Sequence, residues 1–222
     1  MHHKSQASAG TASVQTKGKV IRWHARFYDL ATWFLSFGQA SGIRRMTIEL
    51  AGIGEGERVL DVGCGTGTLA IAAMRRAGPT GEVHGIDPSA EMIAVARGKA
   101  AKVGVEAQFQ TAAMEGLPFP DGHFDLVLSS LMLHHLPPDV KRAGFAEVRR
   151  VLKPGGRFLA VDLADFGGFF GHIFGALHKT AGKLEEAPAM LREAGFGDAE
   201  FGRTKYKPLW VVRATKGGLN ER

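Results

Sequence analysis

The chain has 222 residues, of which 45% are hydrophobic and 23% are charged, and its formal net charge is +6. That length suits one α/β domain with short extensions and leaves little room for a second domain. The composition is ordinary for a soluble globular protein, and no stretch approaches the roughly 18 apolar residues that crossing a bilayer requires.

The positive charge is scattered rather than concentrated. Basic residues stand in separate pairs at 44–45, 75–76 and 149–150. A nucleic-acid-binding surface gathers such residues on one face, so no nucleic-acid partner is expected. The surplus still permits contact with an anionic lipid surface.

Cysteine usage points to a reducing compartment. Cys64 is the single cysteine, which rules out an intrachain disulfide. The N-terminus has no apolar segment of the signal-peptide kind. These features together predict a cytoplasmic protein.

The N-terminal third divides into two parts. Residues 1–18 are rich in small polar residues and predict a disordered tail. Residues 19–54 predict a helical cap of two helices broken around 36–38. The apolar residues that recur there at helical spacing are Trp23, Phe27, Leu30, Phe34, Ile43, Met46 and Leu50.

Residues 55–216 alternate between strand-like and helix-like segments, followed by a short tail at 217–222. The expected strands are 58–62, 82–87, 107–110, 124–129 and 157–163, and the expected helices are 68–76, 90–103 and 140–152. This alternation predicts a Rossmann-like, doubly wound, mostly parallel sheet. A helix at 187–194 and a hairpin of strands 199–205 and 209–214 would complete seven strands, with an antiparallel C-terminal edge strand.

A glycine-rich loop follows the first expected strand, within the segment 59–67. A strand that runs into closely spaced glycines and then a helix lets the backbone approach a ligand closely. The segment 65–70 also matches the dinucleotide-binding fingerprint. Asp87 stands 20 positions after Gly67 and fits either reading, because both need a carboxylate for ribose hydroxyls.

Asp61 separates the two readings. A carboxylate just before the loop would repel a pyrophosphate, and no lysine or arginine stands near it in the loop. S-adenosylmethionine is cationic and carries no phosphate, so opposite charge favours it. A purely structural role, with Asp61 capping the next turn, is the alternative for this residue.

Four motifs resemble those of class I S-adenosylmethionine-dependent methyltransferases in order and spacing. They are the loop 61–67, Asp87, the segment 114–125 and the segment 151–156. Within that class, 28–29 and 35–38 look like the entry helices of the ubiquinone/menaquinone-biosynthesis methyltransferases, and 191–196 resembles the last helix of many small-molecule methyltransferases.

The resemblance implies a role for each matching position in binding S-adenosylmethionine. Asp61 and the loop would hold the methionine part, and Asp87 the ribose. Ala113 and Met114 would flank the adenine, and Ser130 would lie near the methionine end. The loop residues implied are Gly63, Gly65, Thr66 and Gly67.

Three residues are candidates for the chemistry of methyl transfer. His134 and His135 follow the fourth strand, on the side where such sheets bind ligands, and either could act as a general base. Tyr28 could close over the ligands. Packing is the alternative for all three, and no metal site is expected. Quinone-biosynthesis relatives commonly carry Arg-Asn where this histidine pair falls, so the resemblance leaves the acceptor open.

The segment 164–186 is rich in glycine and phenylalanine. Its apolar residues suit one helix face and its glycines suit a mobile lid over an apolar substrate, with peripheral membrane contact or simple packing as alternatives.

The prediction is methyl transfer to a small apolar or lipid-like acceptor. A nicotinamide-dependent oxidoreductase and a non-catalytic S-adenosylmethionine-binding accessory domain are the competing hypotheses. The oligomeric state has no signal in the sequence.

Overall fold

The computed structural model describes residues 16, 40–163, 184–207 and 209–218. Within them a seven-stranded sheet has the order β3-β2-β1-β4-β5-β7-β6. The strands are β1 Arg58–Val62, β2 Glu82–Asp87, β3 Gln108–Thr111, β4 Phe124–Ser130, β5 Leu152–Leu163, β6 Glu200–Arg203 and β7 Leu209–Thr215. The expected Rossmann-like, doubly wound sheet is confirmed.

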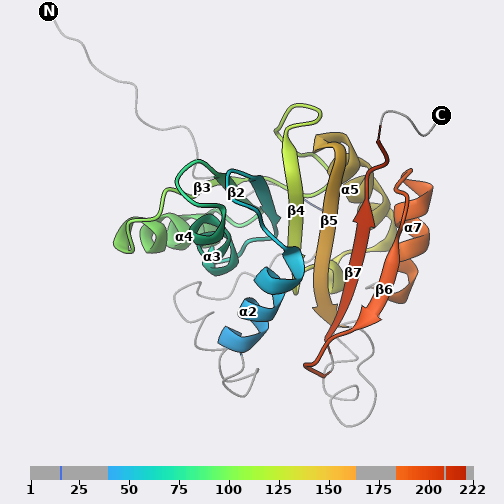
Figure 1. Ribbon diagram of the computed structural model, residues 1–222, viewed down its shortest axis with the longest axis horizontal. Helices are drawn as coiled ribbons and strands as arrows, with labels where there is room; N and C mark the ends of the chain where they lie inside the picture. Colours follow the sequence, from blue (N-terminus) through green and yellow to red (C-terminus); the bar gives the residue numbers. More distant parts are fainter. Residues whose placement is uncertain (1–15, 17–39, 164–183, 208, 219–222) are drawn as a thin grey trace, which may run out of the picture.

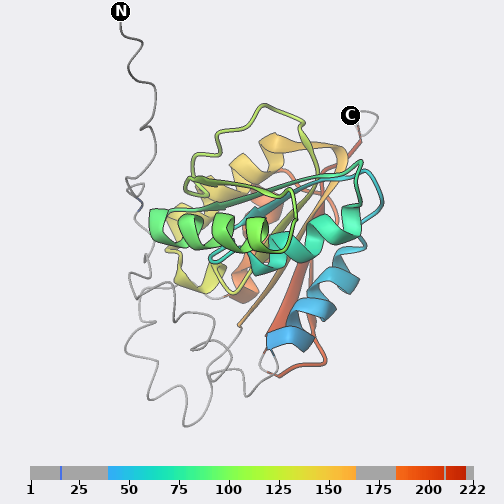
Figure 2. The same ribbon diagram turned by 90° about the vertical axis from the view of Figure 1, so that its left-hand side faces the viewer.

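Helices cover both faces of the sheet and make three layers (Figures 1 and 2). One face carries α2 (Ala40–Ala51), α3 (Thr68–Ala77) and α4 (Ala90–Lys102), and the other carries α5 (Pro138–Val151) and α7 (Ala187–Glu193). Two short 3₁₀ turns, η1 (Leu133–His135) and η2 (Leu184–Glu186), join the second layer. None of the helices in the described ranges is long and apolar enough to cross a bilayer.

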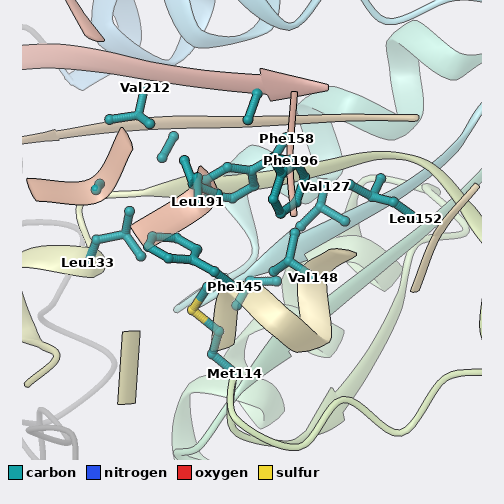
Figure 3. Close-up of a cluster of buried hydrophobic side chains, with 14 of the residues drawn as sticks. Met114, Val127, Leu133, Phe145, Val148, Leu152, Phe158, Leu191, Phe196 and Val212 are labelled. Atoms are coloured by element: carbon teal, nitrogen blue, oxygen red, sulfur yellow. The ribbon is translucent and has the colours of Figure 1, made fainter. Parts of the chain in front are cut away.

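Strands β1 and β4 and the second half of β5 are mostly apolar, because both faces of the sheet are covered there. On the face of α5 and α7, the rings of Phe145, Phe158 and Phe196 pack with Leu191 and Val148 (Figure 3). The opposite face has its own buried cluster, built from α3, α4 and β1–β3. The sheet is therefore the rigid platform on which the strand ends are placed.

The antiparallel strand is β7, and it lies one place in from the edge. It pairs antiparallel with β5 over seven residues and with β6 over four. The more apolar of the two C-terminal strands thus takes the inner place, since β7 has four buried residues and β6 has none. Strand β6 is the edge strand.

Several boundaries differ from the sequence prediction, and the largest difference is at the start of β5. Strand β5 begins at Leu152 rather than at residue 157, because Leu152 already pairs with Phe124 before a register shift. Helix α5 begins at Pro138, because the fixed φ of proline suits the first turn of a helix. Several predicted features lie outside the described residues. They are the N-terminal tail apart from Thr16, the helix break at 36–38, Tyr28 and most of the 164–186 segment.

Gly67 fixes how closely α4 and β3 approach the loop. Its φ is +75°, and an added Cβ would lie 2.7 Å from the Cβ of Ala96 and 2.8 Å from the ring of Phe109. We expect Gly67→Ala to lower the free energy of unfolding by about 3 kcal/mol, from overpacking and from positive-φ strain. Gly104→Ala is the control, since its φ is +64° but nothing lies within 4 Å, so only about 1 kcal/mol should be lost. Urea denaturation measures both, and equal losses would contradict the packing argument.

Candidate active site

A cavity opens where β1, β2 and β4 end, at the carboxyl edge of the sheet. Such edges are where open α/β sheets bind ligands. The residues that line it are Thr16, Val62, Gly63, Gly65, Ile86, Asp87, Pro88, Met92, Ala112, Ala113, Met114, Glu115, Ser130, Leu131, Met132, His135 and Leu136. Six of the nine predicted cofactor residues are among them.

The glycine loop forms the floor of this cavity. The backbone N–H groups of Gly63 and Cys64 donate to the carbonyl of Ile86 at 2.9 and 2.8 Å, which ties the loop to β2. Gly63 has a φ of +75°, and a Cβ there would collide with the side chain of Met132. Glycine is therefore required at Gly63 both by the turn and by the contact.

Asp87 ends β2 and faces the cavity. Its Oδ2 accepts a hydrogen bond from the backbone N–H of Gly65 at 3.1 Å, and its Oδ1 accepts one from Ser89 at 2.9 Å. Burial raises the pKa of Asp87, and the two N–H donors act against that rise. The carboxylate is thus fixed beside the loop, where the sequence placed a ribose contact.

Asp61 lies beneath the loop rather than at the cavity wall. Its side chain is only 1% exposed, it does not line the cavity, and its Oδ2 has no hydrogen-bond partner among the described residues. Burial, followed by the charge of Asp87, raises the pKa of Asp61 to about 7, opposed by the N–H of Ala70. The hydrogen bond from the backbone N–H of Ala70, near the start of α3, is consistent with a capping role for Asp61. The Oδ2 atom, which has no hydrogen-bond partner among the described residues, is consistent with an electrostatic role toward a cationic ligand.

We expect Asp61→Asn to flatten the pH dependence of stability. A carboxyl whose pKa is higher in the folded chain binds protons preferentially there, so stability is greatest below its unfolded value of 3.8 and falls until about pH 7. Between pH 5 and pH 8 the wild type should lose on the order of 3 kcal/mol through this group, and the variant should not. Urea unfolding at stepwise pH measures the difference, and parallel curves for the two proteins would exclude it.

Thr66 and Gly67 also lie outside the cavity lining. The Oγ1 of Thr66 accepts a hydrogen bond from the Nζ of Lys99 at 2.8 Å, and Thr66 is 3% exposed. The loop itself holds no lysine or arginine, but the fold brings the ammonium group of Lys99 to Thr66. Lys99 comes from α4, 33 residues along the chain, and a local reading of the loop could not find it. It is not among the groups that shift the pKa of Asp61.

The adenine end of the expected site is formed by Ala113, Met114 and Glu115. All three line the cavity, while the Met114 side chain also reaches into the core beside Phe145 (Figure 3). The hydroxyl of Thr16 donates to a carboxylate oxygen of Glu115. Thr16, the one described residue of the predicted tail, therefore lies at the cavity.

The other end of the cavity is mostly apolar. Leu131, Met132 and Leu136 line it together with Ser130 and His135. Leu131 has a φ of +54°, a left-handed conformation that is strained for a leucine. Strain of this kind collects at ligand-binding positions, where the surrounding structure enforces it.

The two histidines take different places. His135 lines the cavity, and His134 stands behind it with ring centroids 3.9 Å apart. The Nδ1 of His134 lies 2.5 Å from the Oδ1 of Asp162, which is 1% exposed. Burial alone would raise the pKa of Asp162, but the charge and hydrogen bond of His134 and the backbone N–H groups of Leu163 and His134 hold it below its usual value.

Lys141, on α5, completes the buried charges at this end. It is fully buried, and burial lowers its pKa while the carboxylates of Asp162 and Glu186 act in the opposite direction. The carboxylate of Asp162 therefore acts electrostatically on Lys141, and its hydrogen bond orients the imidazole of His134.

The sequence reasoning missed Asp162, although a signal was present. Asp61, Asp87 and Asp162 are each an acid within the last two residues of a strand of the sheet. The same reasoning that selected the first two applies to the third. Thr16 and Lys141 carried no comparable signal.

Comparison with known proteins agrees with this geometry. Residues 59–156 match the family model described as a methyltransferase domain. The ubiquinone/menaquinone biosynthesis C-methyltransferase of Pseudomonas putida is 42% identical over 139 residues, covering 62% of this chain and 54% of that protein. The corresponding protein of Cupriavidus necator is 38% identical over 137 residues, covering 62% and 56%. A crystal structure of a SAM-dependent methyltransferase from Aquifex aeolicus has a TM-score of 0.64 at 24% identity, covering 78% of this chain and 89% of that one.

The segment that holds the glycine loop and Asp87 therefore matches a methyltransferase domain, and the fold is shared with the solved methyltransferase of Aquifex aeolicus. The sequence resembles the ubiquinone/menaquinone biosynthesis C-methyltransferases, and the chain spans a little more than half the length of those relatives. The methyltransferase-domain match agrees with a sulfonium cofactor and gives no support to a nicotinamide.

Proposed function

We propose that this chain transfers a methyl group from S-adenosylmethionine to a small, apolar or lipid-like acceptor. The observation that carries the proposal is the buried carboxylate pair, Asp61 and Asp87, around the glycine loop. Asp61 has an unpartnered oxygen and Asp87 faces the cavity, so the loop region favours a ligand that is positively charged.

The cofactor fits the residues present. Asp87 would accept hydrogen bonds from the ribose, and Ala113 and Met114 would flank the adenine. Gly63 and Gly65 would admit the methionine part, and a cation bound above them would offset the buried charge of Asp61. The bound cofactor supplies a methyl group on a cationic sulfur, which is a good leaving group.

The acceptor is expected at the end of the cavity lined by Leu131, Met132 and Leu136, whose side chains suit an apolar ring or chain. The relatives' name refers to ubiquinone and menaquinone biosynthesis, which supports a hydroquinone-like ring as the first acceptor to test. In the transfer, the acceptor atom bonds to the methyl carbon as the carbon–sulfur bond breaks, and the acceptor loses a proton. Alignment of the two reactants is the main contribution asked of the protein.

His135 is the residue placed to receive that proton, because it lines the cavity at this end. His134 and Asp162 hold it from behind as positioning residues. Tyr28 and the 164–186 lid stay predictions for closing the cavity, as does a peripheral membrane contact. The free cysteine, Cys64, supports a reducing cytoplasmic location.

Two measurements on the full chain test the proposal. Calorimetric titration should show binding of S-adenosylmethionine and none of NADH. Incubation with methyl-labelled S-adenosylmethionine and an alkylated hydroquinone should transfer the label to the acceptor. Binding of NADH alone would reject the enzyme class. Cofactor binding without transfer to any apolar phenol or hydroquinone would favour a non-catalytic accessory domain.

A further inference from the structure

A second cluster of polar side chains lies at the opposite, amino end of β2. Glu82 and His84 are two residues apart on this strand and so project from the same face. His123 stands just before β4, at the end of the connection that arrives from β3. One potential ligand atom of each side chain lies within 4.8 Å of the other two.

The three ligand atoms have nearly the spacing that a metal ion requires. The Oε1 of Glu82 is 2.6 Å from the Nε2 of His84 and 3.8 Å from the Nε2 of His123. In a tetrahedral zinc site with bonds of about 2.1 Å, ligand atoms are about 3.4 Å apart. Shifts of less than about 1 Å would bring both glutamate–histidine pairs to this spacing, and the ligand nitrogens of the two histidines already lie within 4.8 Å of each other.

The carboxylate of Glu82 is already oriented for this role. Arg58, its partner across the β1–β2 pairing, places its Nε 3.2 Å from Oε2 and leaves Oε1 toward the imidazoles. A hydrogen-bonded outer partner of this kind fixes a ligating carboxylate. The side chain of Arg58 is 47% exposed, so solvent weakens its repulsion of a bound cation.

Aromatic contacts restrain the two imidazoles. The ring of Phe124 lies edge-on to both, at centroid distances of 5.7 Å from His84 and 4.7 Å from His123. Phe119 meets His84 at 5.1 Å. These contacts keep both imidazoles on the same side of β2 as the carboxylate of Glu82.

We propose that Glu82, His84 and His123 bind a divalent transition-metal ion of the zinc type, with water in the open position. Two imidazoles and one carboxylate are a donor set that suits such ions. Asp87 lies five residues further along β2, roughly 16 Å away at 3.3 Å per residue, so the ion takes no part in methyl transfer. It fastens β2 to the connection between β3 and β4, whose first residues line the cofactor cavity.

The experiment titrates zinc chloride into the full chain by calorimetry. The background carries His2→Gln and His3→Gln, so that the N-terminal pair does not contribute. One zinc ion per chain should bind, and His84→Gln, His123→Gln or Glu82→Gln should each weaken the affinity at least about tenfold. His135→Gln and Glu106→Gln, a histidine and an exposed glutamate outside the cluster, are the matched controls and should bind zinc like the parent.

Two further readouts keep the proposal open to rejection if one variant folds poorly. Zinc should raise the thermal midpoint of the parent and not of the His84→Gln/His123→Gln double variant. Cobalt(II) should give visible bands of a low-coordinate site without thiolate charge transfer. The affinity for S-adenosylmethionine should be the same in parent and double variant. Absence of zinc binding, or equal binding in the parent and the double variant, would overturn the site.

Discussion

Asp87→Ala lowers the affinity for S-adenosylmethionine by about 10- to 100-fold, because a ribose diol loses its charged acceptor. Hydrogen bonds to a charged group are worth about 1.5–3 kcal/mol, and each 1.4 kcal/mol is a factor of ten. Asp87 is held by the N–H groups of Gly65 and Ser89, so its oxygens are in place before the ligand arrives. Calorimetric titration of wild type and variant at pH 7.5 measures the loss.

The same two backbone bonds make a structural control necessary. Asp87→Asn keeps the side-chain shape and one acceptor oxygen, and it should lose less affinity than Asp87→Ala while unfolding at nearly the wild-type temperature. Asp198→Ala removes an exposed aspartate far along the chain and should bind the cofactor like wild type. An Asp87→Ala protein that is folded and binds with wild-type affinity would remove the ribose assignment.

The cofactor half of the site could be predicted because its residues are contiguous or sit at strand ends. The loop from Gly63 to Gly67 and the acid after β2 are local patterns, since a parallel sheet brings the ends of neighbouring strands together. Asp61 is 1% exposed and does not line the cavity, so its predicted role toward the methionine part stays a prediction. The burial of Asp61 could have been inferred from the sequence, because an acid inside a short apolar strand of a covered sheet is largely buried.

The acceptor half could not be predicted to the same degree, because its parts come from distant segments. His134 pairs with Asp162, 28 residues away, and Lys141 reaches the same place from α5. No spacing in the sequence indicates that these three residues lie near one another, and the sequence predicted the same role for His134 and His135. The structure separates them by position, because His135 lines the cavity and His134 pairs with the carboxylate of Asp162. Similarly, Glu82, His84 and His123 form a group only after the β3–β4 connection crosses the end of β1.

Asp162→Asn should reduce kcat about 100-fold and leave the affinity for S-adenosylmethionine within about twofold of wild type. A positioned base contributes on the order of 100-fold or more to a proton-transfer step, and an amide holds His134, and through it the base His135, less firmly than a carboxylate does. Asp162 does not line the cavity, which is why binding of the cofactor should be spared. Single-turnover transfer to a responsive acceptor and calorimetric titration separate the two quantities.

His134→Gln removes the other partner of the His134–Asp162 hydrogen bond. It is a second test in case Asp162→Asn folds poorly because the buried Lys141 has lost a nearby negative charge. The two single variants should have similar kcat values, and the double variant should lose little more, because the residues act as one unit. Raising the pH should not restore Asp162→Asn, since the wild-type carboxylate is ionised throughout the working range. Fully additive losses, or an equal fall in cofactor affinity, would show that Asp162 supports the fold around His135 and does not position it for proton transfer.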